Sequence, residues 1–234
     1  MDLIKVEGIV INKKDINDSD RIVIIFTKTF GKISVLLKGI RKSKKRDKIG
    51  SDILSYTRMV VYKKENSYIG NSIECINSYE NIRQDMNKIS VALYIFHVLN
   101  QIFIEGQRNT VIFNLTKNSI NYIEKEKNVM NYTILLVYYL YKIIIDEGLK
   151  FKLEEGRNFS INSSVISNEI LSDSIKLSDS EYEIIKMLYL NQVRELLRKE
   201  IELKDLYSVL KIYEKYLNYH LEMNLELKNY ILEA

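Results

Sequence analysis

The stretch RIVIIFTKTFGKISVLL, residues 21–37, decides the fold of the N-terminal part. Its first half, 21–28, is an almost unbroken apolar run, which is typical of a strand buried on both faces. Phe30-Gly31 then marks a tight hairpin, and apolar residues at 33, 35 and 37 alternate along the next strand. The pattern predicts a β-hairpin inside an all-β domain.

Further strand patterns lie on both sides of this hairpin. Residues 3–14 are rich in Val and Ile and end in the polar turn 15–20, and segments 53–64 and 67–77 also alternate. Five short strands in about 75 residues predict an OB-type barrel, although the periodicity alone also allows an SH3-like barrel.

From residue 81 onward the apolar period becomes helical. Helices are predicted at 89–103, 109–127 and 204–222, and the nearly all-apolar segment 133–145 is too short to span a bilayer. We expect that segment at the buried centre of a bundle. The fold class is therefore α+β, with a barrel domain at 1–80 and a helical domain at 81–234.

One part of the helical domain has no clear period. Residues 148–178 are rich in Ser and Asn, so we expect an irregular excursion or a short hairpin there. Helix returns at Ser178-Asp179-Ser180-Glu181, a capping-box pattern in which Ser178 and Glu181 satisfy each other's backbone donors.

The composition excludes several classes of protein. With 234 residues, 46% hydrophobic and 28% charged, the chain is typical of a soluble globular protein. One Cys and two His exclude a disulfide framework and a multi-Cys zinc site, so no metal or other cofactor is expected. The N-terminus lacks the apolar core of a signal peptide, which favours a cytoplasmic location. Walker A, GxGxxG, GxSxG and HExxH motifs are all missing, and we predict that the protein is not an enzyme.

Positive charge is concentrated in the barrel domain. Residues 1–80 carry 16 Lys and Arg against 10 Asp and Glu, whereas the remaining residues carry 19 against 21. This asymmetry favours an anionic partner for the N-terminal part.

The strongest local feature is the segment 38–48, KGIRKSKKRDK, in which seven of eleven residues are basic. Placed after the third strand, it would form a flexible cationic loop that neutralises phosphates without reading sequence. Five phosphate contacts on a single strand would give a log–log salt slope of roughly −3.5. The alternative is an inert, solvated surface loop. Arg21 likewise either binds phosphate or pairs with its neighbours Asp18 and Asp20.

Aromatic residues of the barrel could add base stacking. Tyr56 and Tyr62 share one face of a strand with Arg58 between them, whereas Phe26 is expected in the core.

The N-terminal sequence resembles the bacterial DNA repair protein RecO family. The resemblance is carried by Val6–Ile11, by Asp18-Ser19-Asp20-Arg21, by Phe30-Gly31-Lys32 and by Lys38-Gly39-Ile40-Arg41-Lys42. Weaker similarity continues through Ile76-Asn77-Ser78-Tyr79 and the C-terminal residues 216–221. The resemblance implies an N-terminal OB domain, a helical C-terminal domain and a role as a recombination mediator.

The resemblance also implies partners and site residues. Family members bind single- and double-stranded DNA, anneal complementary strands, engage the C-terminal tail of the single-stranded-DNA-binding protein, and work with RecR to load RecA. The positions that align with the family's basic residues are Arg21, Lys32, Lys38, Arg41 and Lys42. On charge alone, the same predicted DNA site extends to Lys44, Lys45, Arg46 and Lys48.

The chain departs from the family pattern in one segment. Many relatives carry a four-cysteine zinc site in the part that corresponds to about 148–178, and here no cysteines follow Gly148–Glu155. We therefore expect packing alone to hold this segment, with Phe151, Phe159 and Ile161 as the packing residues.

An acidic, hydrophobic-ended partner tail would need an apolar pocket with basic residues at its rim. The predicted helix 188–199 offers both, and the expected peptide-binding residues are Arg194, Leu197, Arg198 and Lys199. An RNA-binding or ribosome-associated OB protein is the alternative function, and a structural adaptor with an inert loop is a third.

Overall fold

The computed structural model describes residues 2–65 and 67–231, and the chain forms two compact units, 1–125 and 126–234. The sequence placed the domain division at 80/81. The unit boundary lies later because helix α2 (Met86–Ile102) packs against strand β1 (Asp2–Ile16), and α3 (Thr110–Lys125) packs against α2. The first three helices therefore belong to the same compact unit as the barrel.

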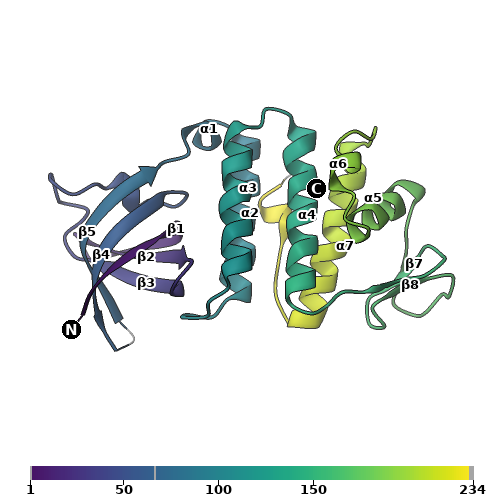
Figure 1. Cartoon of the computed structure of the whole chain (residues 1–234), viewed down its shortest axis with the longest axis horizontal. Coiled ribbons are helices and arrows are strands. Elements are labelled where there is room, and N and C mark those ends of the chain that lie inside the picture. The colour runs from purple at the N-terminus through teal and green to yellow at the C-terminus, as the bar shows by residue number, and fades with distance from the viewer. Residues whose placement is uncertain (1, 66, 232–234) are drawn as a thin grey trace. The chain divides into compact units, whose positions relative to one another are not determined.

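The first unit contains a closed five-stranded barrel (Figure 1). Its remaining strands are β2 (Asp20–Thr27), β3 (Gly31–Leu37), β4 (Tyr56–Lys64) and β5 (Ser67–Asn77). The strand order is β1-β2-β3-β5-β4, in which only β3 and β5 run parallel. This arrangement is an OB-type barrel, so that prediction is confirmed.

The second half of strand β2 is buried on both faces, as its apolar run predicts, whereas Ile22 and Ile24 in the first half are half-buried. Val23 and Ile25 point into the barrel core, where they pack with residues such as Ile33 and Val35. Phe26 is also fully buried, but its ring lies 5.2 Å from that of Phe103, at the end of α2. The barrel thus uses one face of β2 for its own core and the other for the helices.

The hairpin between β2 and β3 requires glycine at its turn. Gly31 has a φ of +68°, and a Cβ atom there would lie 1.9 Å from the backbone oxygen of Gln107. No other residue could keep both this backbone conformation and this close approach. Helix α1 (Glu80–Arg83) follows β5, and the Glu124 carboxylate accepts hydrogen bonds from the backbone N–H groups of Asn81 and Ile82.

The second unit is built on a helix pair. Helix α4 (Val129–Asp146) packs against α7 (Leu203–Leu221), and α5 (Asp179–Tyr189) packs on α7 and on the short α6 (Val193–Leu196). By length and composition α4 could cross a membrane, but residues such as Leu140 and Ile144 are fully buried inside the unit. This agrees with the expected central helix of a bundle.

For helix α5, the start is predicted correctly and the end is not. The capping box of Ser178 and Glu181 is present at the start of α5. The predicted helix 188–199 is wrong, because α5 ends at Tyr189 and Asn191 adopts the left-handed conformation with a φ of 60°.

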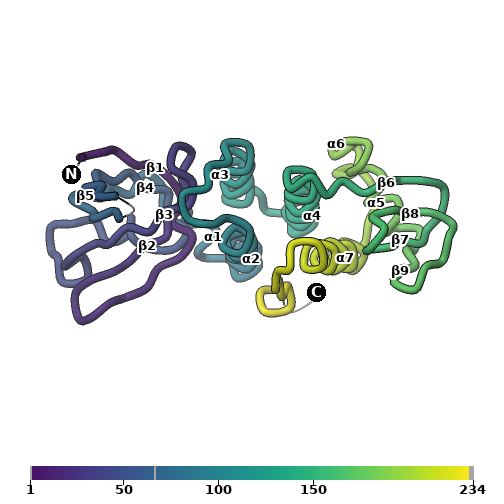
Figure 2. The backbone as a smooth tube through the Cα atoms, turned by 90° about the horizontal axis from the view of Figure 1, so that it is seen from below, coloured from purple at the N-terminus to yellow at the C-terminus, as the bar shows by residue number. Residues whose placement is uncertain are grey.

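Residues 148–178 are more regular than expected. They form a small four-stranded sheet of order β6-β8-β7-β9 (Figure 2). The strands are β6 (Lys152–Leu153), β7 (Asn158–Ser160), β8 (Val165–Ser167) and β9 (Ser174–Lys176). Each is two or three residues long, too short to produce a visible apolar period.

Both packing and polar contacts hold this small sheet in place. The buried rings of Phe151 and Phe159 lie 5.0 Å apart, and Phe159 stacks on Tyr216 of α7 at 5.4 Å. The Tyr216 hydroxyl forms hydrogen bonds with the backbone oxygen of Leu149 (2.9 Å), to which it donates, and with the Ser164 hydroxyl (2.7 Å). The predicted packing residues Phe151, Phe159 and Ile161 are buried, as expected. The expectation that packing alone holds the segment is wrong, because hydrogen bonds from α7 also hold it.

Candidate nucleic-acid interface

The basic loop, residues 38–48, leaves β3 and lies beside the turn that joins β1 to β2. The Arg41 backbone N–H donates to the backbone oxygen of Ser19 (3.0 Å), and its guanidinium donates to that of Asn17 (2.8 Å). The Gly39 backbone N–H donates to Asp20 Oδ1 (2.8 Å). These bonds fix the first half of the loop to one end of the barrel.

Two residues fix the second half of the loop. The Arg46 guanidinium donates to the backbone oxygens of Lys38 (2.7 Å) and Gly70 (3.3 Å), and burial lowers its pKa. The Asp47 carboxylate accepts the backbone N–H of Cys75 (2.6 Å). The loop is therefore held to β5 at two points rather than being free, and Arg46 faces the protein instead of solvent.

The remaining lysines of the loop point outward. Lys38, Lys44, Lys45 and Lys48 are exposed, and none of them forms an ion pair within 4.0 Å among the described residues. We call these four residues the loop lysines. Four exposed ammonium groups that have no ion pair within 4.0 Å in the described residues, on a loop whose backbone is fixed, form a surface suited to a phosphate backbone.

Two further predicted residues lie beside the loop lysines but already have carboxylate neighbours. Arg41 is 3.3 Å from Asp15, and Lys42 is 3.9 Å from Asp18. The side chains of Arg41 and Lys42 are 37% and 68% exposed, so water competes with both pairs. Such solvated ion pairs are weak, so Arg41 and Lys42 can leave their carboxylate partners and bind a phosphate instead.

Arg21 is not part of this exposed surface. Its side chain is only 12% exposed and contacts Asp15 (2.7 Å) and Asp52 (2.9 Å), rather than the expected neighbours Asp18 and Asp20. Burial acts to lower the pKa of Arg21, but the two carboxylates outweigh it and the pKa is raised. Arg21 therefore ties β2 to β1 and to the segment that precedes β4.

Lys32 lies away from the loop lysines. Its ammonium donates to the backbone oxygen of Asn100 in α2 (2.8 Å), and burial lowers its pKa. The nine predicted residues thus divide into an exposed group on the loop and three cations with contacts inside the first unit, namely Arg21, Lys32 and Arg46.

The expected stacking face on β4 is partly covered. Tyr56 is only 7% exposed, and the ammonium of Lys117 lies 4.2 Å from its ring centre. Tyr62, at 37% exposure, is the more accessible ring on that strand.

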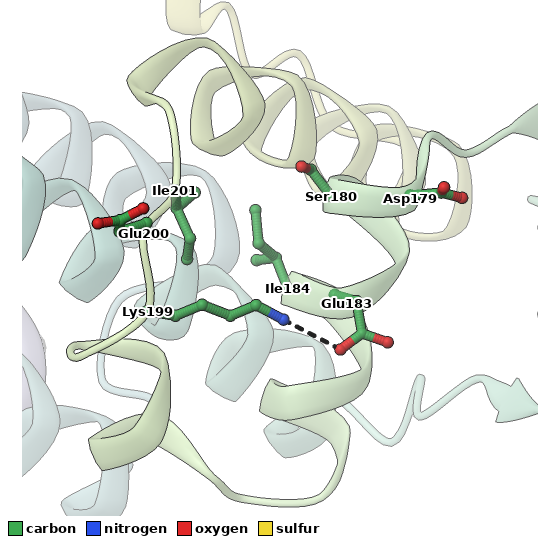
Figure 3. A pocket seen from close by; sticks show the side chains of 7 residues that line it. All are labelled: Asp179, Ser180, Glu183, Ile184, Lys199, Glu200 and Ile201. Carbon is green, nitrogen blue, oxygen red and sulfur yellow. Dashed lines mark hydrogen bonds and ion pairs between the residues drawn. The ribbon is translucent and has the colours of Figure 1, made fainter.

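One of the four predicted peptide-binding residues, Lys199, lines a hollow of acidic character (Figure 3). Its lining includes Asp179, Glu183 and Glu200, and the Lys199 ammonium lies 3.2 Å from the Glu183 carboxylate. Leu197 is 39% exposed. Arg194 and Arg198 are exposed on and after α6 and do not line the hollow. The structure therefore does not gather the four residues into one basic-rimmed apolar pocket.

Sequence reasoning missed a second cationic group. Lys5, Lys28, Arg58 and Lys117 line one pocket of the first unit. They come from β1, the β2–β3 turn, β4 and α3, so no run of basic residues in the sequence indicates this group.

A closed OB-type barrel with an exposed lysine loop, followed by a helical unit, defines an OB-fold protein with a basic barrel end. Residues 1–79 match the family model described as Recombination protein O N terminal, and residues 83–229 match Recombination protein O C terminal. The chain belongs to the Recombination protein O family, as the sequence resemblance predicted.

Curated relatives agree with this assignment. The chain is 29% identical to DNA repair protein RecO of Alkaliphilus metalliredigens, over 94% of each chain. It is 26% identical to DNA repair protein RecO of Caldanaerobacter subterraneus, over 100% of this chain and 99% of the relative. It is also 34% identical to DNA repair protein RecO of Acetivibrio thermocellus, over 53% of this chain and 50% of the relative.

Proposed function

We propose that this protein is a cytoplasmic, nucleoid-associated and non-enzymatic mediator of DNA repair and recombination. It binds single- and double-stranded DNA, anneals complementary strands and, with RecR, helps load RecA onto DNA coated by single-stranded-DNA-binding protein. Family membership and the names of the relatives support the repair role. The observation that carries the DNA-binding step is the set of loop lysines without ion pairs on an anchored loop.

The mechanism of binding is electrostatic. Lysines that neutralise phosphates release condensed counterions, and this entropy gain requires no particular base sequence. Since Arg46 and Asp47 fix the loop backbone, less conformational entropy is lost when the lysines meet a strand. A neutralised strand repels its complement less strongly, which favours their pairing.

Docking of an acidic partner tail belongs to the second unit. The carboxylates that line the hollow beside Lys199 would repel such a tail, and Lys199 is already paired with Glu183. The exposed residues Arg194, Leu197 and Arg198 therefore carry this part of the proposal. Arg198→Glu should weaken binding of the tail peptide, whereas Lys199→Gln should leave it nearly unchanged. Equal affinity of the Arg198→Glu variant and the wild type would refute this docking site.

Strand annealing tests the proposed function. Two complementary single strands with a donor and an acceptor dye are mixed with the wild type and with Lys44→Gln/Lys45→Gln/Lys48→Gln. The wild type should accelerate annealing at low salt, and the triple variant should lose most of the acceleration. A matched control, Lys176→Gln/Lys211→Gln/Lys215→Gln, removes the same charge from exposed positions of the second unit and should anneal as the wild type does.

Two results would contradict the proposal. Wild-type protein that fails to accelerate annealing would exclude the mediator mechanism, and tighter binding of structured RNA than of DNA would favour an RNA-binding protein. Equal loss in the triple variant and in the control would show that overall charge, not the loop, is responsible.

A further inference from the structure

A second cationic site lies in the first unit, in a pocket between the barrel and α3. The pocket has a volume of about 450 Å³, within the range of ligand-binding pockets. Strand register builds it, because Gly8 pairs with Thr27 and Glu7 pairs with Arg58. These pairings bring Lys5, Lys28 and Arg58 around one opening, and α3 adds Lys117.

The charge of this pocket is strongly positive. Its lining holds four cations and a single carboxylate, Glu7. The Tyr56 hydroxyl and the Arg58 guanidinium donate hydrogen bonds to Glu7, and these bonds lower the pKa of Glu7 against the opposing effect of burial. Glu7 therefore remains ionised and pairs with Arg58, which also contacts Glu74 at 3.4 Å. The charge of Lys117 also acts on Glu7, so the four cations of the lining outnumber the two carboxylates that contact or attract them.

One of the three lysines is held in a fixed position. The Lys117 ammonium donates to the Tyr56 hydroxyl at 2.9 Å and lies 4.2 Å from the Tyr56 ring centre. Beside it, the buried Phe113 supplies an apolar wall. Lys5 and Lys28 are exposed at the opening and form no ion pair within 4.0 Å in the described part of the chain. Such a site can hold one phosphate group with an apolar surface beside it for the attached sugar.

The pocket and the loop lysines lie at opposite ends of β2. Asp20, at the start of the strand, binds the loop at Gly39, whereas Lys28 follows its last residue, Thr27. Eight residues at about 3.3 Å each place Lys28 roughly 25 Å from the end that holds Gly39. Around the other side of the closed barrel, the pairing of β3 with β5, β5 with β4 and β4 with β1 places Lys5 about three strand spacings, roughly 14 Å, from Lys38. The two cationic groups are therefore centred at different ends of β2, and Lys5 is the pocket lysine that the strand register places nearest to the loop.

We propose that the pocket lined by Lys5, Lys28 and Lys117 binds a phosphodiester of a nucleic-acid strand, and that this strand is distinct from the one on the loop lysines. The proposal rests on the proposed function, because strand pairing needs two backbones on one protein. It adds the place where the second strand is held.

Amide NMR spectra of the full chain titrated with the trinucleotide (dT)3 test this proposal. At roughly 3.4 Å per nucleotide, the probe is too short to bridge the two sites. Signals of Lys28 and Thr29 report on the pocket, and signals of Lys44 and Lys45 report on the loop. We expect both sets to shift in the wild type, each with its own saturation curve.

Two variants separate the sites. Lys5→Gln/Lys28→Gln should weaken the response of the pocket signals and leave the loop signals as in the wild type. One phosphate held in the pocket predicts a log–log salt slope of about −0.7 there, which is an affinity loss of about threefold between 50 and 200 mM salt. Lys44→Gln/Lys45→Gln/Lys48→Gln should show the reverse pattern, with the loop response weakened.

Other results would overturn the proposal in distinguishable ways. Shifts at the loop but not at the pocket would remove the second site and leave the proposed function intact. Inorganic phosphate that saturates the pocket as tightly as (dT)3 would indicate a free-anion site instead of a strand site. If neither set of signals moves, the proposed function itself fails.

Discussion

Replacing Arg46 and replacing Lys45 should have opposite consequences, although the two residues are adjacent in the basic loop. Arg46 donates to the backbone oxygens of Lys38 and Gly70, whereas the side chain of Lys45 is exposed. Methionine keeps a long apolar stem but removes the charge and the donors. Arg46→Met should therefore release the loop from β5, and Lys45→Met should only remove a phosphate contact.

The magnitude follows from these contacts. A hydrogen bond from a charged donor contributes about 1.5–3 kcal/mol when it is buried. The bond to Lys38 is exposed and the bond to Gly70 is partly buried, so solvent reduces the sum of the two to about 1–2 kcal/mol. An exposed substitution such as Lys45→Met should change stability by no more than about 0.5 kcal/mol.

Hydrogen exchange of the Cys75 amide measures the release of the loop. This N–H donates to Asp47, the residue next to Arg46, so it exchanges when the loop leaves β5. A loss of 1–2 kcal/mol should accelerate its exchange roughly 5- to 30-fold in Arg46→Met. Lys45→Met should exchange as the wild type does, while its log–log salt slope for single-stranded DNA should become shallower by about 0.7.

The opposite pattern would refute this division of roles. If Arg46→Met left Cys75 exchange unchanged and lost as much salt slope as Lys45→Met, Arg46 would be a phosphate ligand and not an anchor.

Three further predictions concern stability. Hydrogen bonds from Arg21 to Asp15, and from Gly39 and Ser19 to Asp20, lower the pKa values of these carboxyl groups from the ordinary 3.8. The stabilising contribution of these two carboxylates is thus complete above pH 3.8 and is lost as the pH falls through their lowered pKa values. Asp15→Asn should therefore make the thermal midpoint of the barrel less dependent on acid pH. A pH profile equal to that of the wild type would contradict this. Phe151→Ala should destabilise the second unit by about 3–5 kcal/mol in urea unfolding, because its ring lies at the centre of the cluster under the small sheet, and should leave DNA affinity intact. Ser178→Ala should cost about 1 kcal/mol by removing the cap of α5, with Ser180→Ala as the exposed control; equal unfolding midpoints for the two variants would disprove the capping role.

Much of the fold was predictable because its signals are local. The apolar run predicts β2, whose residues 23 and 25–27 are buried because the barrel and the helices share this strand. The capping box at Ser178 marks a helix start within four residues. The small sheet gave no such signal, since strands of two or three residues cannot show a period. The helix break after Tyr189 was also missed, because apolar residues at helical spacing continue through it.

The candidate site was predictable only in part. A run of basic residues is visible in the sequence, but the groups that bind or pair with those residues lie far away along the chain. The carboxylate of Asp52 that pairs with Arg21 lies 31 residues away, and the carbonyl of Gly70 that binds Arg46 lies 24 residues away. A run of basic residues therefore indicates a cationic surface without showing which members are free. Lys117, 61 residues from Tyr56, could be placed in its pocket only from the structure.

The salt dependence of single-stranded DNA binding tests the central claim most directly. Fluorescence anisotropy of a labelled strand would be recorded at 50 and 200 mM salt for the wild type and for Lys44→Gln/Lys45→Gln/Lys48→Gln. With the protein in excess and at most one strand bound per protein, the measurement reports on the site of higher affinity, which is expected to be the loop lysines in the wild type. Four loop lysines on a strand predict a slope of about −2.8 and an affinity loss of about 50-fold, and the variant should retain a slope of about −0.7 with a loss of about threefold. Equal slopes for the two proteins would contradict the account, because the loop lysines would then not contact the strand.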